Sequence, residues 1–378
     1  MAYLIGEEHE LMRRTVREFA ETELASRAKE MDETGNFPWD LVKRAAELNL
    51  LGIMVPEEYG GAGSDMLSCA IAIEEVSRAN ATLGIIIAAH KLGSDALMIA
   101  GTEEQKQKYL APIARGEKLA AFGLTEPGAG SDAGSLATTA ERDGDTWVLN
   151  GTKCFITNCG PAEIYVVAAK TDKDAGVRGI STFIVEKGTP GFSIGKLEEK
   201  MGLHASATGE LIMDNCRIPA ENILGPVNKG FSIFMKALDG GRVAIAAMAL
   251  GIAQASLDAS VEFSKQRKQF GRPIASFQAI AFYLAEMATK IEAARSLTYR
   301  AASLKDAGQP FGKEAAMAKY YASEVAMWCS TKAVQIHGGY GYTKNFPVER
   351  YMREAKLTEI GEGTSEVQKL VISRLLTE

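Results

Sequence analysis

The sequence predicts a mostly α-helical protein with a central β unit, divided into residues 1–120, 121–225 and 226–378. The chain has 378 residues, which is too long for one ordinary core of about 150 residues. Apolar residues recur at helical spacing at both ends, whereas short runs rich in β-branched and aromatic residues fill the middle. These observations favour an N-terminal helical domain, a middle β-sheet or β-barrel domain and a C-terminal four-helix bundle.

Composition and charge exclude several classes of protein. The 42 basic and 48 acidic residues give a net charge of −6, whereas nucleic-acid-binding domains are usually basic. The longest apolar run, Val243 to Ala253, is shorter than the ~20 residues of a membrane-spanning helix. The start lacks a basic segment and a cleavable apolar core, so we expect a cytoplasmic, bacterial-type protein without a targeting sequence. Five dispersed cysteines and four histidines predict reduced thiols and no metal site.

The first 120 residues carry helical patterns that are separated by loop signals. Apolar side chains recur at helical spacing over residues 11–24 and 41–48. Proline and glycines in residues 56–64 interrupt the pattern, and Ser64 or Asp65 is placed to cap the next helix. Further helices are expected over residues 67–77, 83–99 and 103–114.

The middle region changes to β-strand patterns. Its short segments rich in β-branched and aromatic residues predict four strands, over Thr146–Thr157, Ile164–Ala169, Gly179–Val185 and Glu210–Ile218. Asp143-Gly144 is typical of a hairpin turn before the first of them. We therefore expect a small antiparallel sheet or barrel.

After Pro226 the chain is predicted to be helical again. The long apolar patterns predict helices over Phe231–Val261, Phe277–Leu304, Lys313–Ile336 and Thr364–Leu376. These helices are apolar on more than one face, so we expect some of those faces to contact other subunits.

The segment Gly123 to Asp132 is the densest chemical signal. Its three glycines and one proline force a tight loop that presents backbone amides and small hydroxyl groups to a polar cofactor or phosphate. It contains neither the Gly-x-Ser-x-Gly of a nucleophile elbow nor the Gly-Lys-Ser/Thr of a phosphate-binding loop. From the residues alone, an ordinary turn is the alternative interpretation.

Three further clusters lie in the C-terminal region. In residues 335–342 paired glycines follow a long helix, as in a ligand-contacting turn or a plain helix C-cap. Residues 265–273 form a basic helix end, which is either a solvated surface or an anion site. Glu362 lies between two glycines just before a helix that Thr364 would cap. The helix N-terminus favours the carboxylate and burial raises its pKa, so Glu362 is either a base near neutral pH or a solvated surface residue.

These four clusters, in this order on a helix–β–helix layout, resemble the acyl-CoA dehydrogenase family over essentially the full chain. Residues 123–135 match the first family signature and residues 335–354 match the second. Arg267-Lys-Gln-Phe-Gly and Glu362-Gly-Thr add two shorter matches. The resemblance implies a homotetramer, or dimer of dimers, with one FAD per subunit. It also implies α,β-dehydrogenation of an acyl-CoA and transfer of the electrons to electron-transfer flavoprotein.

The resemblance assigns roles to individual residues. Glu362 would remove the α-proton while FAD accepts the β-hydride, and its backbone amide would help to polarise the thioester carbonyl. Residues 267, 270 and 335–339 would reach the FAD of a neighbouring subunit. The implied cofactor-binding residues are Phe122, Leu124, Thr125, Ser131, Phe155, Thr157, Arg267, Phe270, Gln278, Gln335, Ile336, Gly338, Gly339, Thr364 and Glu366. The implied substrate-binding residues are Ser131, Asp239, Arg242, Glu362 and Gly363.

The family contains alternatives that the residues help to weigh. Some members carry the base one residue before the arginine that matches Arg242, where this chain has Gly241. An acyl-CoA oxidase is disfavoured because such oxidases are generally much longer. A decarboxylating glutaryl-CoA-type reaction is disfavoured because no extra tyrosine follows the Glu362-Gly-Thr turn. A flavin-free relative is disfavoured because the signature residues are retained.

The substrate is predicted to be a short, branched or cyclic acyl-CoA. The family often has an aromatic residue, packed on the acyl chain, where this chain has Gly361. The pocket for the acyl chain is therefore either open at this position or filled by a neighbouring side chain. His204 replaces an arginine that many members have. His90 and Lys91 fall on a helix near the expected pocket floor, where they would contact a polar acyl tail or lie on the surface.

Overall fold

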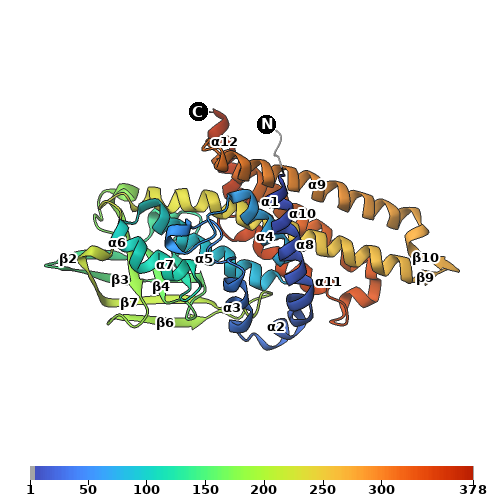
Figure 1. Cartoon of the computed structure of the whole chain (residues 1–378), viewed down its shortest axis with the longest axis horizontal. Helices are drawn as coiled ribbons and strands as arrows, with labels where there is room; N and C mark the ends of the chain where they lie inside the picture. Colours follow the sequence, from blue (N-terminus) through green and yellow to red (C-terminus); the bar gives the residue numbers. More distant parts are fainter. Residues whose placement is uncertain (1–4, 378) are drawn as a thin grey trace.

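The structure is a computed structural model that describes residues 5–377. The first four residues, on which the expectation of no targeting sequence partly rests, lie outside the described residues. The β-sheet lies at one end of the long axis and the β9–β10 hairpin (Lys268–Gln269 and Arg272–Pro273) lies at the other (Figure 1). Helices from both ends of the sequence fill the space between them (Figure 1).

The predicted N-terminal helices are confirmed. Asp65 caps α4 by accepting a hydrogen bond from the amide of Ser68 over 2.7 Å, and Asn80 caps α5 in the same way through Leu83 over 3.1 Å. The helices are α1 (Glu7–Phe19), α2 (Ala28–Thr34), α3 (Trp39–Glu47), α4 (Met66–Ala79), α5 (Ala81–Ala100), α6 (Glu103–Gln105) and α7 (Ala111–Ala114).

The middle region forms an eight-stranded sheet. All four predicted strands are present, and the turn at Gly144 joins β2 to β3 as predicted. The sheet is mostly antiparallel, as expected, but β1 runs parallel to β4 and the β2–β3 hairpin forms part of the crossover between them. The strands are β1 (Ala120–Gly123), β2 (Thr139–Asp143), β3 (Thr146–Thr157), β4 (Ile164–Lys170), β5 (Ile180–Glu186), β6 (Phe192–Leu197), β7 (Thr208–Pro219) and β8 (Ile223–Leu224).

The C-terminal helices pack around α8, which has 37 residues and is therefore about 55 Å long. All four predicted helices are present. A fifth helix, α11, was not predicted, because closely spaced charged residues obscure its apolar pattern. The helices are α8 (Gly230–Gln266), α9 (Gln278–Asp306), α10 (Gly312–His337), α11 (Val348–Ile360) and α12 (Ser365–Thr377).

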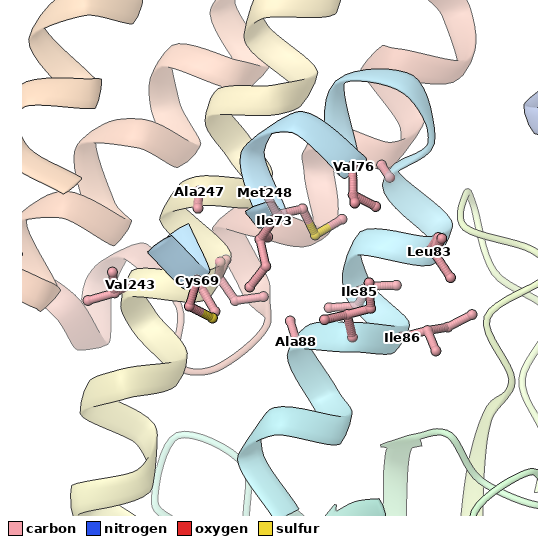
Figure 2. Close-up of a cluster of buried hydrophobic side chains, with 14 of the residues drawn as sticks. Cys69, Ile73, Val76, Leu83, Ile85, Ile86, Ala88, Val243, Ala247 and Met248 are labelled. Atoms are coloured by element: carbon pink, nitrogen blue, oxygen red, sulfur yellow. The ribbon is translucent and has the colours of Figure 1, made fainter. Parts of the chain in front are cut away.

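The helices α4, α5 and α8 share one apolar core (Figure 2). Ile73 of α4, Ile86 of α5 and Val243 of α8 are at most 1% exposed. By length and composition alone α5 and α8 could cross a membrane, but 83% and 78% of their most apolar windows are buried inside the protein. We therefore regard both as core helices, which the sheet and the other helices cover.

Candidate active site

The loop between α11 and α12 carries Glu362 in a strained conformation. Glu362 has a φ of 53°, in the left-handed region that side chains rarely adopt, and Gly363 follows with a φ of 94°. The hydroxyl oxygen of Thr364 accepts a hydrogen bond from the amide of Val367 over 3.3 Å, which confirms the predicted cap of α12. The loop therefore holds the carboxylate at a fixed place beside a helix N-terminus.

Glu362 is half-buried, and its Oε2 atom lies against α8 and α5, away from solvent. A Cβ atom at Gly241 would come within 2.1 Å of Glu362 Oε2, so the glycine on α8 makes room for the carboxylate. The same position lies 2.8 Å from a methyl carbon of Leu92 on α5. Oε2 is buried and has no hydrogen-bond partner among the described residues. The alternative of a solvated surface carboxylate is thus wrong.

Burial raises the pKa of Glu362 to about 7. The positive charges that oppose this rise belong to Lys91, Lys319 and Arg242, in that order of strength. The carboxyl group therefore changes its charge close to neutral pH, as a general base requires.

Two buried side chains that the sequence analysis did not identify fix the Glu362 loop. Gln368 Nε2 donates to the carbonyl oxygens of Glu362 and Gly363 over 3.2 and 2.9 Å. Lys319 Nζ, from α10, donates to the Gly363 carbonyl over 2.7 Å. Burial lowers the pKa of Lys319 to about 8. A polar residue on an otherwise apolar helix face was the available sequence signal for both.

The glycine-rich loop after β1 is held by a buried ion pair between Glu126 and Lys153. Glu126 accepts hydrogen bonds from the amides of Ala137 (2.5 Å) and Thr138 (3.0 Å), and from Lys153 Nζ (2.6 Å). The loop backbone stays open, because a Cβ atom at Gly128 or Gly130 would meet nothing within 4 Å. Ser131 is exposed and Thr125 is half-buried, so both hydroxyl groups lie near the loop surface. An ordinary turn does not need such a buried support.

The strand β3 turns Phe155 outward beside this loop. A register shift between Lys153 and Ile156 marks a bulge, Phe155 has a φ of 58°, and its side chain is 65% exposed. Thr157 follows and is half-buried. Phe122 and Leu124 instead point into the protein: Phe122 packs on Phe234 with ring centroids 4.4 Å apart, and Leu124 is buried.

Thr364 and Glu366 lie beside Glu362, at the start of α12, where Glu366 is exposed. The other predicted cofactor residues lie at the other end of the bundle. A cavity of about 560 Å³ brings Arg267, Ile336, Gly338 and Gly339 together. The Arg267 guanidinium lies 5.6 Å from the ring centre of Tyr340. Gln278, Gln335 and Phe270 are exposed there, the last to 93%. The glycines again leave open backbone, since a Cβ atom at either would meet nothing within 4 Å.

The two halves of the predicted cofactor site are far apart within one chain. Gly241 touches the Glu362 carboxylate, and Phe263 lines the 560 Å³ cavity. The 22-residue step along α8 from Gly241 to Phe263 corresponds to about 33 Å. The residues around that cavity are therefore distant from Glu362 of the same chain.

The other substrate-site predictions have mixed outcomes. Asp239 and Arg242 form an ion pair on α8, with 2.5 Å between Asp239 Oδ1 and a guanidinium nitrogen of Arg242. The two residues proposed to hold coenzyme A therefore lie side by side. His90 and Lys91 are buried, so the surface alternative for them is wrong. His204 lies elsewhere: its Nδ1 is 2.7 Å from the carbonyl oxygen of Asp32.

Backbone strain singles out the predicted site residues. Eight non-glycine residues of the described chain have a positive φ, and four of them are asparagines, which tolerate it. The other four are Phe155, Leu203, Phe270 and Glu362, three of which the sequence analysis had assigned to the site. Strain of this kind commonly persists at functional positions.

Models of the N-terminal, middle and C-terminal domains of acyl-CoA dehydrogenase match residues 6–117, 121–216 and 228–377. The chain is 54% identical to the short-chain-specific acyl-CoA dehydrogenase of Clostridium acetobutylicum, over 99% of both proteins. It is 48% identical to the solved butyryl-CoA dehydrogenase of Megasphaera elsdenii, with a TM-score of 0.98 and full coverage of both chains. A chain in a structure described as the electron-transferring flavoprotein of Acidaminococcus fermentans is 52% identical, with a TM-score of 0.98, over 100% of this chain and 99% of that one.

The fold and site therefore define an FAD-dependent oxidoreductase that acts on a CH–CH bond. The chain belongs to the acyl-CoA dehydrogenase family.

Proposed function

We propose that this protein dehydrogenates a short acyl-CoA to the 2-enoyl-CoA, with Glu362 as the base. The observation that carries the proposal is the Glu362 carboxylate, which is buried at Gly241, has a pKa of about 7 and has no partner at Oε2. A free, desolvated carboxylate accepts a proton from carbon better than one held in a salt bridge.

The residues around the glycine-rich loop fit a flavin. Gly128 and Gly130 leave backbone open for close approach, Thr125 and Ser131 supply hydroxyl groups, and the outward-turned Phe155 supplies an aromatic face. Thr157, Thr364 and Glu366 complete the proposed set. When bound, FAD supplies the acceptor for the β-hydride. The chain's own contribution is to hold the α-carbon against Glu362 and to exclude water from it.

The separation along α8 supports an oligomeric site. Arg267, Phe270, Gln278 and the residues 335–339 are too far from Glu362 to share its FAD, so they serve the FAD of a neighbouring subunit in a homotetramer. The exposure of Phe270 and the two open glycines is consistent with a surface that another subunit and its cofactor cover. We infer a cytoplasmic location. We also infer electron-transfer flavoprotein as the electron acceptor, since a chain 52% identical to this one belongs to a structure described as an electron-transferring flavoprotein.

Gly361 bears on the size of the acyl group. Its φ of −63° is one that any residue adopts, and the three atoms nearest to a Cβ there would all belong to Leu357 of its own helix, at 3.5 Å or more. The backbone at this position therefore accommodates a side chain. We propose that Asp239 and Arg242 hold the coenzyme A part, while Ser131 and the Gly363 backbone contact the thioester end.

A substrate panel tests the proposal. The purified FAD protein is assayed with straight, branched and cyclic acyl-CoA substrates, with electron-transfer flavoprotein or with oxygen as the acceptor. We expect turnover of short acyl-CoA with the flavoprotein and little with oxygen. Turnover with oxygen at an equal rate would instead indicate an oxidase, and the absence of flavin reduction by every acyl-CoA would refute the proposal.

A further inference from the structure

The base is surrounded by cations that are each held by a different acceptor. Lys91 pairs with Asp95 in a short contact on α5. Arg242 pairs with Asp239, and Lys319 donates to the Gly363 carbonyl. Within residues 5–377 no ion pair joins any of them to Glu362, whose Oε2 has no partner. The carboxylate thus lies in a positive field without a direct salt bridge.

Two consecutive glycines on α8 create this arrangement. A Cβ atom at Gly240 would lie 3.0 Å from Asp95 Oδ2, 3.2 Å from Lys91 Nζ and 3.3 Å from Lys305 Nζ. A Cβ atom at Gly241 would lie 2.1 Å from Glu362 Oε2. The ion pair and the base therefore occupy adjacent niches on one turn of one helix. Lys91 and Asp95 are only 5% and 3% exposed, so water screens their charges weakly.

We propose that the Lys91–Asp95 pair is a positioning element for proton transfer: Asp95 holds the Lys91 ammonium near Glu362 and keeps it from forming a salt bridge with the base. This inference rests on the proposed function. Without the ammonium, the buried carboxyl group would stay protonated at neutral pH. With an unrestrained ammonium, the carboxylate would be paired and would lose its basicity.

Other charged groups lie around the same niche. Arg242 of α8 and Lys319 of α10 act on Glu362 directly. Lys305 at the end of α9 and Cys69 of α4 face Lys91 and Asp95. The groups behind them are Asp239 beside Arg242, Asp306 beside Lys305, and Glu359 and Glu366 beside Lys319. The two members of the α5 pair act on Glu362 in opposite directions: Lys91 lowers the pKa of Glu362 and Asp95 raises it.

The test uses these opposite signs. The rate of flavin reduction by a saturating short acyl-CoA is measured against pH in anaerobic single turnovers of the FAD protein. In Lys91→Met the acid limb of the pH–rate profile should move to higher pH by about one unit, because the ionised base loses the cation that stabilises it. In Asp95→Asn the acid limb should move to lower pH by about one unit, because the released Lys91 ammonium pairs with the base. The maximal rate should also fall, because a paired carboxylate is a weaker base. Shifts in the same direction, or no shift, would overturn the proposal.

Two further variants separate this role from a purely structural one. Lys305→Met removes an ammonium that faces the pair but is not among the main charges acting on Glu362, so its acid limb should stay in place. A shift equal to that of Lys91→Met would count against a specific role for Lys91. If an unpaired buried charge prevents folding, the charge-neutral Lys91→Met/Asp95→Leu variant is used.

Relative to the wild type, the double variant should shift the acid limb to higher pH by less than about one unit, because Lys91 acts on Glu362 more strongly than Asp95 does. An unchanged limb overturns the proposal.

Glu362→Gln separates the positioning role of the α5 pair from the role of Glu362 as the base. If that variant is inactive while the pair variants show no opposite shifts, the positioning role alone fails. If it stays active, the assignment of the base fails.

Discussion

The two ends of α8 differ in how completely one chain builds them. Near Gly241 the Glu362 loop is fixed by the buried donors Lys319 and Gln368, and Oε2 of its carboxylate is buried. Near Phe263 the predicted cofactor residues line an open cavity, and Phe270 is 93% exposed. The residues proposed for acid–base chemistry are therefore brought together within one chain. The residues near Phe263 instead form an open surface that another molecule can cover. Substitutions at the first end should change chemistry, and those at the second should change cofactor binding and assembly.

Removing the base is the strongest test of the enclosed end. Glu362→Gln keeps the size of the side chain, so the fold, the FAD content and the oligomer should be unchanged. Turnover should fall by about 10³-fold, within the range for loss of a general base. Flavin absorbance and the rate of acyl-CoA dehydrogenation are measured on the same sample. Near-normal turnover would show that another group removes the α-proton.

A side chain at Gly361 tests the shape of the enclosed end. Gly361→Tyr should fold, since the backbone φ is −63° and the nearest atom to a new Cβ is 3.5 Å away. The ring should narrow the slot and lower kcat/KM for branched or cyclic substrates relative to butyryl-CoA, by roughly tens-fold to a few hundred-fold. The ratio of the two specificity constants cancels general damage to the fold. Gly361→Ala is the control and should change that ratio little.

The prediction at Gly361 fails if the wild type prefers butyryl-CoA over every branched or cyclic analogue and the tyrosine variant keeps the same ranking. In that case a neighbouring side chain, not the residue at 361, would form the wall beside the acyl group.

The sequence predicted the helix–β–helix order, four of the eight strands of the sheet and the residues of the four clusters, because local periodicity and glycine-rich signatures record them. It did not predict α11, whose dense charges hide its apolar face. It also missed Lys153, Lys319 and Gln368, because a buried polar residue within a strand or helix becomes recognisable only when its distant partner is known. The pairing of β1 with β4 was missed for the same reason, since register between distant segments is not a local property.

Removing a cation tests the open end. Arg267→Ala should weaken FAD retention by about tenfold, the loss expected for one charge-assisted hydrogen bond, and should lower oligomer stability together with it. Flavin content after dialysis and mass by light scattering are measured on one sample. The exposed Lys265, two residues away, supplies a matched control as Lys265→Ala, which should change neither. Loss of flavin from an oligomer of unchanged stability would contradict a shared site.

Two glutamines allow the smallest and most direct comparison of the two ends. Gln368 is buried and is the side chain that donates to the Glu362 carbonyl, whereas Gln335 is exposed near the open cavity. Gln368→Leu should lower kcat several-fold and the free energy of unfolding by about 1–2 kcal/mol, because the Glu362 carbonyl loses that donor. The loss is limited, since Lys319 still holds the Gly363 carbonyl and the buried, unpaired Oε1 of Gln368 is removed as well. Gln335→Leu should leave the unfolding of the subunit unchanged and reduce flavin retention slightly. Chemical denaturation and flavin release are measured for both variants, and equal effects of the two on kcat would erase the distinction between the enclosed and the open end.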